Sequence, residues 1–171
     1  GLHPIQYNCA ENYYNQMATL TLTPQETTIL QLYSRETQGF FSEGVLATFV
    51  VVYFVCAVIS FGLSVPSGLF IPSMMLGAAM GRLVGELLYK IAPGTVEPGL
   101  YALVGASAVL GGITRMTISL TVIMVETSND INYLLPIMLA CGVSKLVGDV
   151  FTVSIYDARI KSAKVPYLEA E

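Results

Sequence analysis

The chain has 171 residues, of which 54% are hydrophobic and only 12% are charged, and its mean hydropathy is +0.65. This composition excludes an ordinary soluble domain and indicates a membrane protein embedded in a lipid bilayer. The net charge of −4 excludes a nucleic-acid-binding protein, because basic residues cluster only at Arg159, Lys161 and Lys164. The chain begins with Gly1 and lacks the features of a signal peptide there, so we expect a piece of a longer protein.

The N-terminal segment, residues 1 to 42, is polar and mixed, and it predicts a loop that ends in a short helix near residues 28 to 33. It carries several glutamates and a single arginine, whereas positive charge is concentrated after residue 158. By the positive-inside rule we expect this loop in the lumen or outside the cell. Membrane helices would then cover residues 43 to 158, and residues 159 to 171 would start a cytosolic tail.

Residues 45 to 61 form the strongest candidate for a membrane helix, because this uncharged run is about as long as a hydrocarbon core of roughly 30 Å requires. A buried helix of a soluble domain is the alternative. After this run the apolar stretches are shorter and are broken by Gly, Pro or a charge. The further helices expected cover residues 70–89, 99–112, 115–127, 134–147 and 149–158. Broken helices at membrane depth are typical of transporters and channels.

Two patterns predict how these helices pack. Three glycines recur every fourth residue on one helix, at Gly77, Gly81 and Gly85. They form a smooth stripe that another helix can approach closely. Two pairs of opposite charge are spaced i, i+4, namely Arg82 with Glu86 and Lys145 with Asp149. We expect each pair to neutralise itself locally.

The segment from Gly68 to Pro72, Gly-Leu-Phe-Ile-Pro, lies where an uncharged run turns helical. A helix start leaves its first amide hydrogens without intrahelical partners and carries about half a positive charge. Gly68 removes the side chain that would crowd an ion, and Pro72 occupies a first-turn position where proline costs no hydrogen bond. Because no residue between Gly44 and Gly81 is charged, the field of these amides is screened little. The segment therefore predicts an anion site.

Three stretches carry a resemblance to one family of membrane proteins. Residues 64–85, SVPSGLFIPSMMLGAAMGRLVG, contain a GxFxP pattern, residues 101–138 supply the helices that follow it, and residues 145–157, KLVGDVFTVSIYD, form a last membrane helix. In this order and spacing they resemble the CLC family of chloride channels and chloride/proton antiporters. The resemblance implies an all-α, multi-pass membrane protein with broken and tilted helices, holding the second half of an inverted-repeat membrane domain.

The resemblance also implies a chloride site. The residues assigned to it are Gly68, Leu69, Phe70, Ile71, Pro72 and Tyr156. In the family the amides of the residues matching Leu69 and Phe70 help to coordinate the ion, and a tyrosine near the start of the last membrane helix, here Tyr156, contributes its hydroxyl. A phenol donates a hydrogen bond without a charge that would trap the ion. An interfacial tyrosine before a cytosolic tail is the alternative reading of Tyr156.

Other parts of the family pattern have no counterpart in this sequence. The GSGIP segment, the GxEGP segment and the separate proton-transfer glutamate of the antiporters do not occur in it. The choices between channel and exchanger, and between chloride and nitrate, therefore stay open. Glu126 ends an apolar run and invites a proton-pathway role. Since polar residues follow it directly, we expect a helix end there instead.

The resemblance further predicts partners and location. It implies chloride as the transported ion, with or without coupling to protons, and no cofactor. It implies a homodimer formed through the helices near residues 115–127 and 134–147, and an accessory subunit. The segments VPSGLFIP and IYD resemble those of the endolysosomal and vacuolar branch of the family. We therefore expect an intracellular membrane, with the plasma membrane as the alternative.

Two other classes of function are alternatives to transport. An intramembrane aspartyl protease is the nearest enzyme, because Asp149 and Asp157 follow glycine and tyrosine, but the order and spacing of these dipeptides do not fit that class. Serine catalysis is disfavoured because His3 is the single histidine and no Gly-x-Ser-x-Gly segment exists. We expect no enzymatic activity. The remaining alternative is a truncated, non-conducting subunit that dimerises with a full-length partner.

Overall fold

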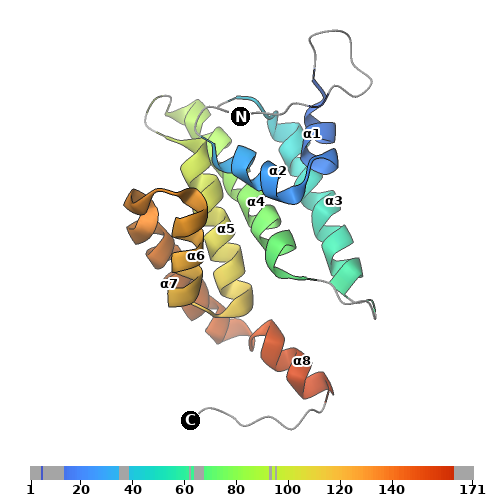
Figure 1. The fold of residues 1–171 in the computed structure, drawn as a ribbon, viewed down its shortest axis with the longest axis vertical. Helices are drawn as coiled ribbons and strands as arrows, with labels where there is room; N and C mark the ends of the chain where they lie inside the picture. Colours follow the sequence, from blue (N-terminus) through green and yellow to red (C-terminus); the bar gives the residue numbers. More distant parts are fainter. Residues whose placement is uncertain are drawn as a thin grey trace.

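The regular secondary structure is entirely helical in the part of the chain that the computed structural model describes, which confirms the all-α prediction (Figure 1). The described residues are 5, 14–34, 39–61, 63, 68–92, 94 and 96–163. Parts of the expected N-terminal loop (residues 1–4, 6–13 and 35–38), the Ser64 to Ser67 part of the GxFxP stretch and the tail from Lys164 lie outside these residues.

Two short helices, α1 (Gln16–Leu22) and α2 (Gln25–Tyr33), precede the membrane helices. Asn15 caps α1, because its side-chain oxygen accepts the N–H groups of Met17 at 3.1 Å and Ala18 at 3.3 Å. The helix predicted near residues 28 to 33 is confirmed by α2. The sequence did not predict α1, since a helix of two turns carries too short an apolar pattern to stand out.

The helix α3 (Glu43–Phe61) confirms the membrane helix predicted over residues 45 to 61. Only Leu46 and Phe49 of this helix are buried in the structure. Val45, Val50 and Tyr53 are partly buried against the core, and most of the other apolar side chains of α3 face outward, as expected for a helix that contacts lipid or further protein.

The centre of the fold is the pair of neighbouring helices α4 (Phe70–Ile91) and α5 (Pro98–Thr114). The glycine stripe makes their close contact possible, as predicted. A Cβ atom on Gly77 would lie 2.7 Å from the carbonyl oxygen of Gly105, and one on Gly81 would collide with the carbonyl oxygen of Tyr101. The backbones therefore touch where a side chain on either glycine would hold them apart.

The predicted pairing of Arg82 with Glu86 is confirmed. Arg82 is completely buried, and its Nε lies 3.3 Å from Glu86 Oε1. Its Nη1 also donates to the carbonyl oxygens of Leu32 at 2.7 Å and Ser34 at 3.1 Å. Arg82 therefore fastens the end of α2 to the middle of the bundle, in addition to neutralising Glu86.

The C-terminal half contains α6 (Ile118–Ser128), a 3-10 turn (Ile131–Tyr133), α7 (Leu134–Phe151) and α8 (Ile155–Ala163). Two expectations are wrong here. The helix predicted over residues 149–158 is instead split, because α7 continues to Phe151 and α8 starts after Ser154. Ser154 caps α8 by accepting the N–H of Asp157 at 3.1 Å. The carboxylate of Asp149 pairs with Arg115 at 2.6 Å rather than with Lys145.

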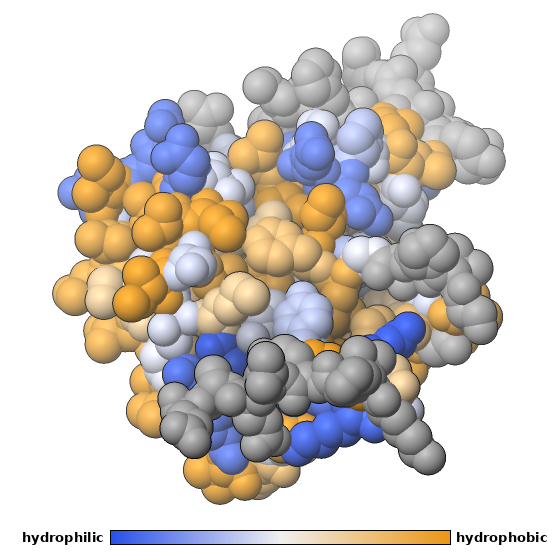
Figure 2. All heavy atoms as spheres, turned by 60° about the horizontal axis from the view of Figure 1, so that its bottom comes forward, coloured by the Kyte–Doolittle hydropathy of each residue, from blue (hydrophilic) through white to orange (hydrophobic). Residues whose placement is uncertain are grey.

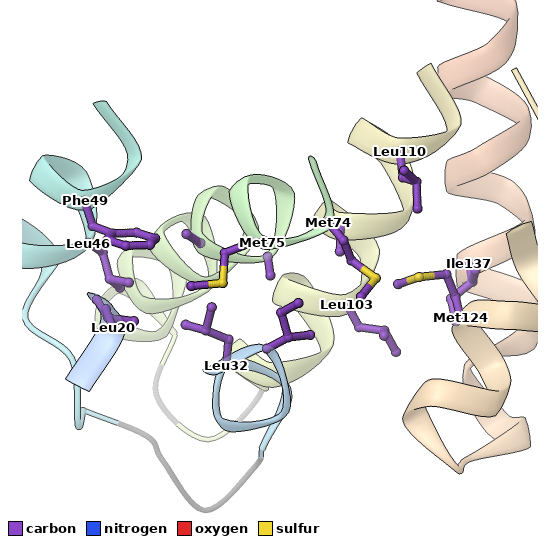
Figure 3. Packing of buried hydrophobic residues seen from close by; sticks show 14 of the residues in the cluster. Leu20, Leu32, Leu46, Phe49, Met74, Met75, Leu103, Leu110, Met124 and Ile137 are labelled. Carbon is purple, nitrogen blue, oxygen red and sulfur yellow. The ribbon is translucent and has the colours of Figure 1, made fainter. Parts of the chain in front are cut away.

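The hydrophobic core runs across the bundle on both sides of α4 (Figure 3). On one side Met75 packs with Leu32 from α2 and with Leu46 and Phe49 from α3. On the other side α4 and α5 face α6 and α7 through Met74, Leu103, Leu110, Met124 and Ile137. One continuous core therefore links the two short N-terminal helices to the C-terminal half.

The outer surface is strongly apolar. Three stretches of the described residues are long and apolar enough to cross a membrane, namely Glu43–Phe61, Phe70–Ile91 and Ile131–Ala163. Seen from the end that carries α8, hydrophobic side chains dominate the sides of the molecule, with hydrophilic ones gathered in patches (Figure 2). An exposed apolar surface of this extent fits lipid or additional membrane helices and not water.

Candidate anion site

The candidate site is the start of α4. The first intrahelical hydrogen bond joins the Ser73 amide to the Leu69 carbonyl at 3.1 Å, and Pro72 has no N–H. The amides of Phe70 and Ile71 have no intrahelical acceptor, and no acceptor for them occurs among the described residues. The two open donors lie where the helix dipole is positive.

No side chain caps this helix start. Leu69 stands at the N-cap position with φ −94° and ψ −20°, and it makes no side-chain capping bond. Most helices place Ser, Thr, Asp or Asn there so that an oxygen satisfies the first amides. Because a leucine side chain cannot accept a hydrogen bond, the first amides of α4 stay available for another acceptor.

Ser73 is a residue of the first turn that the sequence reasoning did not include. Its hydroxyl donates to the carbonyl oxygens of Leu69 at 2.7 Å and Phe70 at 2.9 Å. These bonds hold the first turn closed and fix the direction of the preceding amides. A serine directly after the proline was the available signal, since serine in a first turn commonly bonds to nearby backbone groups.

A pocket of about 220 Å³ adjoins the start of α4. Its lining residues are Gln25, Tyr53, Cys56, Ala57, Ser60 and Phe61, together with Gly68, Leu69 and Pro72. Not one of these residues carries a charge. A Cβ atom on Gly68 would meet no atom of the described residues within 4 Å, so the glycine leaves open space beside the amides. This arrangement agrees with the predicted reason for a glycine at this position.

Tyr156 is the second residue of α8, and its side chain is 45% exposed. Helix α8 lies at the end of the bundle where α4 begins (Figure 1). It is linked to the end of α3 by Arg159, whose guanidinium carbon lies 5.2 Å from the centre of the Phe61 ring. Among the described residues no hydrogen bond joins the Tyr156 hydroxyl to residues 68–72. The structure therefore brings the two parts of the predicted site to one end of the bundle without a hydrogen bond between them.

The buried charged pair of α4 and the acid that ends α6 lie away from the start of α4. The buried Arg82 and Glu86 pair with each other three turns further along the helix. Glu126 lies in the last turn of α6, as expected for an acid at a helix end. The neighbouring Thr127 and Ser128 share a pocket with Tyr33 of α2 and Gly99 at the beginning of α5. Glu126 is therefore near the opposite end from the candidate site.

The hydroxyl of Tyr33, at that opposite end, is buried and has no hydrogen-bond partner in the described part of the chain. Burial raises the pKa of Tyr33 above its ordinary range, because the phenolate would lose its hydration.

No group of three or more His, Cys, Asp or Glu side chains that could hold a metal ion occurs among the described residues. The polar groups that line the candidate site belong to backbone amides and to the uncharged side chains of Gln25, Tyr53 and Ser60.

Comparison with known proteins agrees with this picture. Residues 10–149 match the family model described as voltage gated chloride channel. The chain is 44% identical to H(+)/Cl(-) exchange transporter 7 of Bos taurus over 171 residues, which is 99% of this chain and 21% of that protein. It is 41% identical to chloride channel protein CLC-b of Arabidopsis thaliana over 166 residues, 96% of this chain and 21% of that protein.

A solved structure gives the same result. The crystal structure of a eukaryotic CLC transporter superposes with a TM-score of 0.74 at 33% sequence identity, covering 88% of this chain and 26% of that one. The chain spans about a fifth of the length of the curated relatives it matches. Tyr156 lies beyond the residues that the family model matches, within the stretch that matches the bovine protein.

Proposed function

The chain belongs to the family of voltage gated chloride channels, and we propose that it forms part of the membrane domain of an anion channel or chloride/proton exchanger. In this role the amides at the start of α4, those of Leu69, Phe70 and Ile71, hold chloride together with the Tyr156 hydroxyl. Transport makes and breaks no covalent bond. The ion exchanges hydration water for amide and hydroxyl donors and leaves again, which requires binding of moderate strength.

The uncapped start of α4 is the observation that carries this proposal. It combines open amides at Phe70 and Ile71, space in front of Gly68, and an adjoining pocket without a charged residue. A lysine or arginine at this place would hold an anion too strongly for rapid release, and a carboxylate would repel it. Dipoles alone supply the intermediate strength that conduction needs.

Anion flux through a full-length transporter that contains this chain tests the proposal. We expect Gly68→Leu to block the space in front of the amides, and Tyr156→Phe to remove a donor, so that both change anion flux or selectivity. Gly44→Leu is the matched control, because a Cβ atom on Gly44 also meets no atom of the described residues within 4 Å, and this residue is outside the site. Unchanged conductance and selectivity in both site variants would exclude the assignment.

An exchanger is favoured over a channel by the bovine relative, whose name specifies H(+)/Cl(-) exchange. The plant relative is named a chloride channel, so the distinction needs its own measurement. Simultaneous recording of proton and chloride movement in proteoliposomes separates the two. Proton transport driven by a chloride gradient identifies an exchanger, and its absence identifies a channel.

The topology is part of the proposal. Helices α1 and α2 lie toward one end of the bundle and α8 at the other (Figure 1), which supports an N-terminal segment on the luminal or outer side and a tail from residue 159 in the cytosol. The membrane segment would cover residues 43 to 158. Protease accessibility of tags placed at each end of the full-length protein tests this orientation, and microscopy of the tagged protein tests an intracellular against a plasma-membrane location.

The proposed function also includes dimerisation through α6 and α7. Both helices present exposed apolar side chains, among them Val122, Ile123, Leu135, Leu139 and Val143. The same surface would allow the alternative function, in which the chain alone binds a full-length subunit without conducting. Expression of the chain alone, followed by flux measurement and co-purification with a full-length partner, distinguishes assembly from transport. An accessory subunit would be detected in the same purification.

A further inference from the structure

We propose that Arg115 is a positioning residue whose guanidinium fixes the end of α7, and through it the place of α8 and of Tyr156. The link to anion transport rests on the role of Tyr156 in the proposed function. The positioning of α8 itself does not depend on that role and is tested separately below.

The contacts of Arg115 converge on the junction between α7 and α8. Its Nη1 lies 2.6 Å from Asp149 Oδ1 and 3.3 Å from the carbonyl oxygen of Lys145. Its Nη2 donates to the carbonyl oxygen of Thr152 at 3.0 Å and to the Thr152 hydroxyl at 3.2 Å. One side chain thus binds the last two turns of α7 and the first residue after it.

The local chemistry explains why an arginine suits this position. The last carbonyl groups of a helix lack amide partners and carry the negative end of the helix dipole, so a cation there is stabilising. The planar guanidinium donates in two directions at once, and an ammonium group cannot reproduce this fork. Gly148 lets it approach the helix backbone, because a Cβ atom there would lie 2.6 Å from the guanidinium carbon of Arg115.

The backbone of Arg115 is fixed as well. It ends α5 in the left-handed conformation with φ 63°, and its N–H donates to the Gly111 carbonyl at 2.9 Å. This conformation is unfavourable for a residue with a side chain and persists where surrounding contacts hold it. Here the four contacts of the guanidinium provide that support. Arg115 therefore fixes the α7–α8 junction relative to α5, which is a central helix of the fold.

The segment between α7 and α8 is so short that fixing the end of α7 also fixes the place of Tyr156. Thr152, Val153 and Ser154 alone separate α7 from α8, and Ser154 caps the new helix through Asp157. Near its middle, α8 is fastened by the contact of Arg159 with Phe61 at the end of α3. Tyr156 therefore lies between two arginine contacts. Without the contact at Arg115, α8 keeps its attachment to α3 and is free to pivot over the start of α4.

Two measurements on the full-length transporter test the inference. Spin labels on Lys161→Cys in α8 and Leu63→Cys after α3 report the position of α8 as a distance distribution. The chloride to nitrate selectivity ratio reports the anion site. Arg115→Gln removes the forked cation, and Arg115→Lys keeps the charge without the fork. Lys90→Gln is the matched control, because Lys90 forms an interhelical ion pair with Glu43 outside the candidate site.

We expect Arg115→Gln to broaden the label distance and to shift the selectivity ratio about threefold or more, in the same direction as Tyr156→Phe. Arg115→Lys should give a smaller shift in the selectivity ratio. This variant replaces Arg115→Gln as the test if Arg115→Gln does not fold. The double variant Arg115→Gln/Tyr156→Phe should be no more affected than Tyr156→Phe alone, because both changes remove the same contact. Lys90→Gln should change neither measurement.

The outcomes separate the two proposals. An unchanged label distance in the Arg115 variants overturns the positioning inference. An unchanged selectivity ratio in those variants, when Tyr156→Phe shifts it, overturns it as well, and so do additive effects in the double variant. A broadened distance combined with no effect of Tyr156→Phe upholds the positioning of α8 and instead removes Tyr156 from the proposed function.

Discussion

The guanidinium of Arg82, completely buried in α4, contacts the carboxylate of Glu86 one turn further on, with 3.3 Å between Nε and Oε1. The same guanidinium reaches the carbonyl oxygens of Leu32 and Ser34. The backbone N–H of Gly39 lies 3.4 Å from Glu86 Oε1. The pair thus joins a membrane helix to the segment that follows α2.

Loss of Arg82 is expected to be far more damaging than loss of the Glu86 charge. Arg82→Met leaves the Glu86 carboxylate buried without its partner and removes the donor to two carbonyls, so we expect about 3 kcal/mol or more of destabilisation. Glu86→Gln keeps a hydrogen-bond acceptor for Arg82 and should cost less. Thermal unfolding of the detergent-solubilised full-length protein measures both. Equal melting temperatures for the two variants would contradict this assignment.

The contact between α4 and α5 predicts a second result. Gly81→Ala places a Cβ atom against the Tyr101 carbonyl oxygen, which belongs to backbone and cannot turn away. The helices must separate, and we expect a destabilisation of about 1–3 kcal/mol, as in other overpacked interiors. Gly44→Ala is the control, because that position is open and alanine favours a helix by about 0.5–1 kcal/mol. The prediction fails if Gly81→Ala matches Gly44→Ala in thermal stability.

Substitution of Tyr33, unlike the two substitutions above, is expected not to lower the stability of the protein. Its buried hydroxyl has no partner among the described residues, and the raised pKa of Tyr33 keeps it neutral at physiological pH. Tyr33→Phe removes an unsatisfied polar group of the kind that costs about 1–3 kcal/mol to bury. We expect unchanged or increased thermal stability and unchanged anion flux. A clear loss of stability would reveal a hydrogen bond to the hydroxyl in the full-length protein.

Local patterns were enough to predict α3 and α4. The apolar run ending at Phe61 set the length of the first membrane helix, and Gly68 with Pro72 marked the beginning of the next. The glycine stripe also identified the close helix contact. These features are read from residues within one or two helical turns of each other, which is the range over which sequence periodicity is informative.

The errors arose from contacts between distant residues. Arg115 and Asp149 are 34 positions apart, so the i, i+4 spacing of Lys145 and Asp149 suggested the wrong partner. The break after Phe151 was missed for a related reason. Its cause is the cap that Ser154 provides together with the hold of Arg115 on Thr152, and the apolar pattern continues through it.

Chloride binding at the start of α4 should also be visible as ligand-dependent stability, without any measurement of transport. An ion that binds only the folded protein raises the stability by RT ln(1 + [L]/Kd), about 2.7 kcal/mol when its concentration is 100 times Kd. Replacing gluconate by chloride at constant ionic strength should therefore raise the melting temperature of the full-length protein. Gly68→Leu fills the space beside the Phe70 amide and should abolish most of this increase, whereas Gly44→Leu should retain it. Because ionic strength is held constant, surface screening contributes equally to both salts, and an identical chloride response in Gly68→Leu would place the bound ion elsewhere.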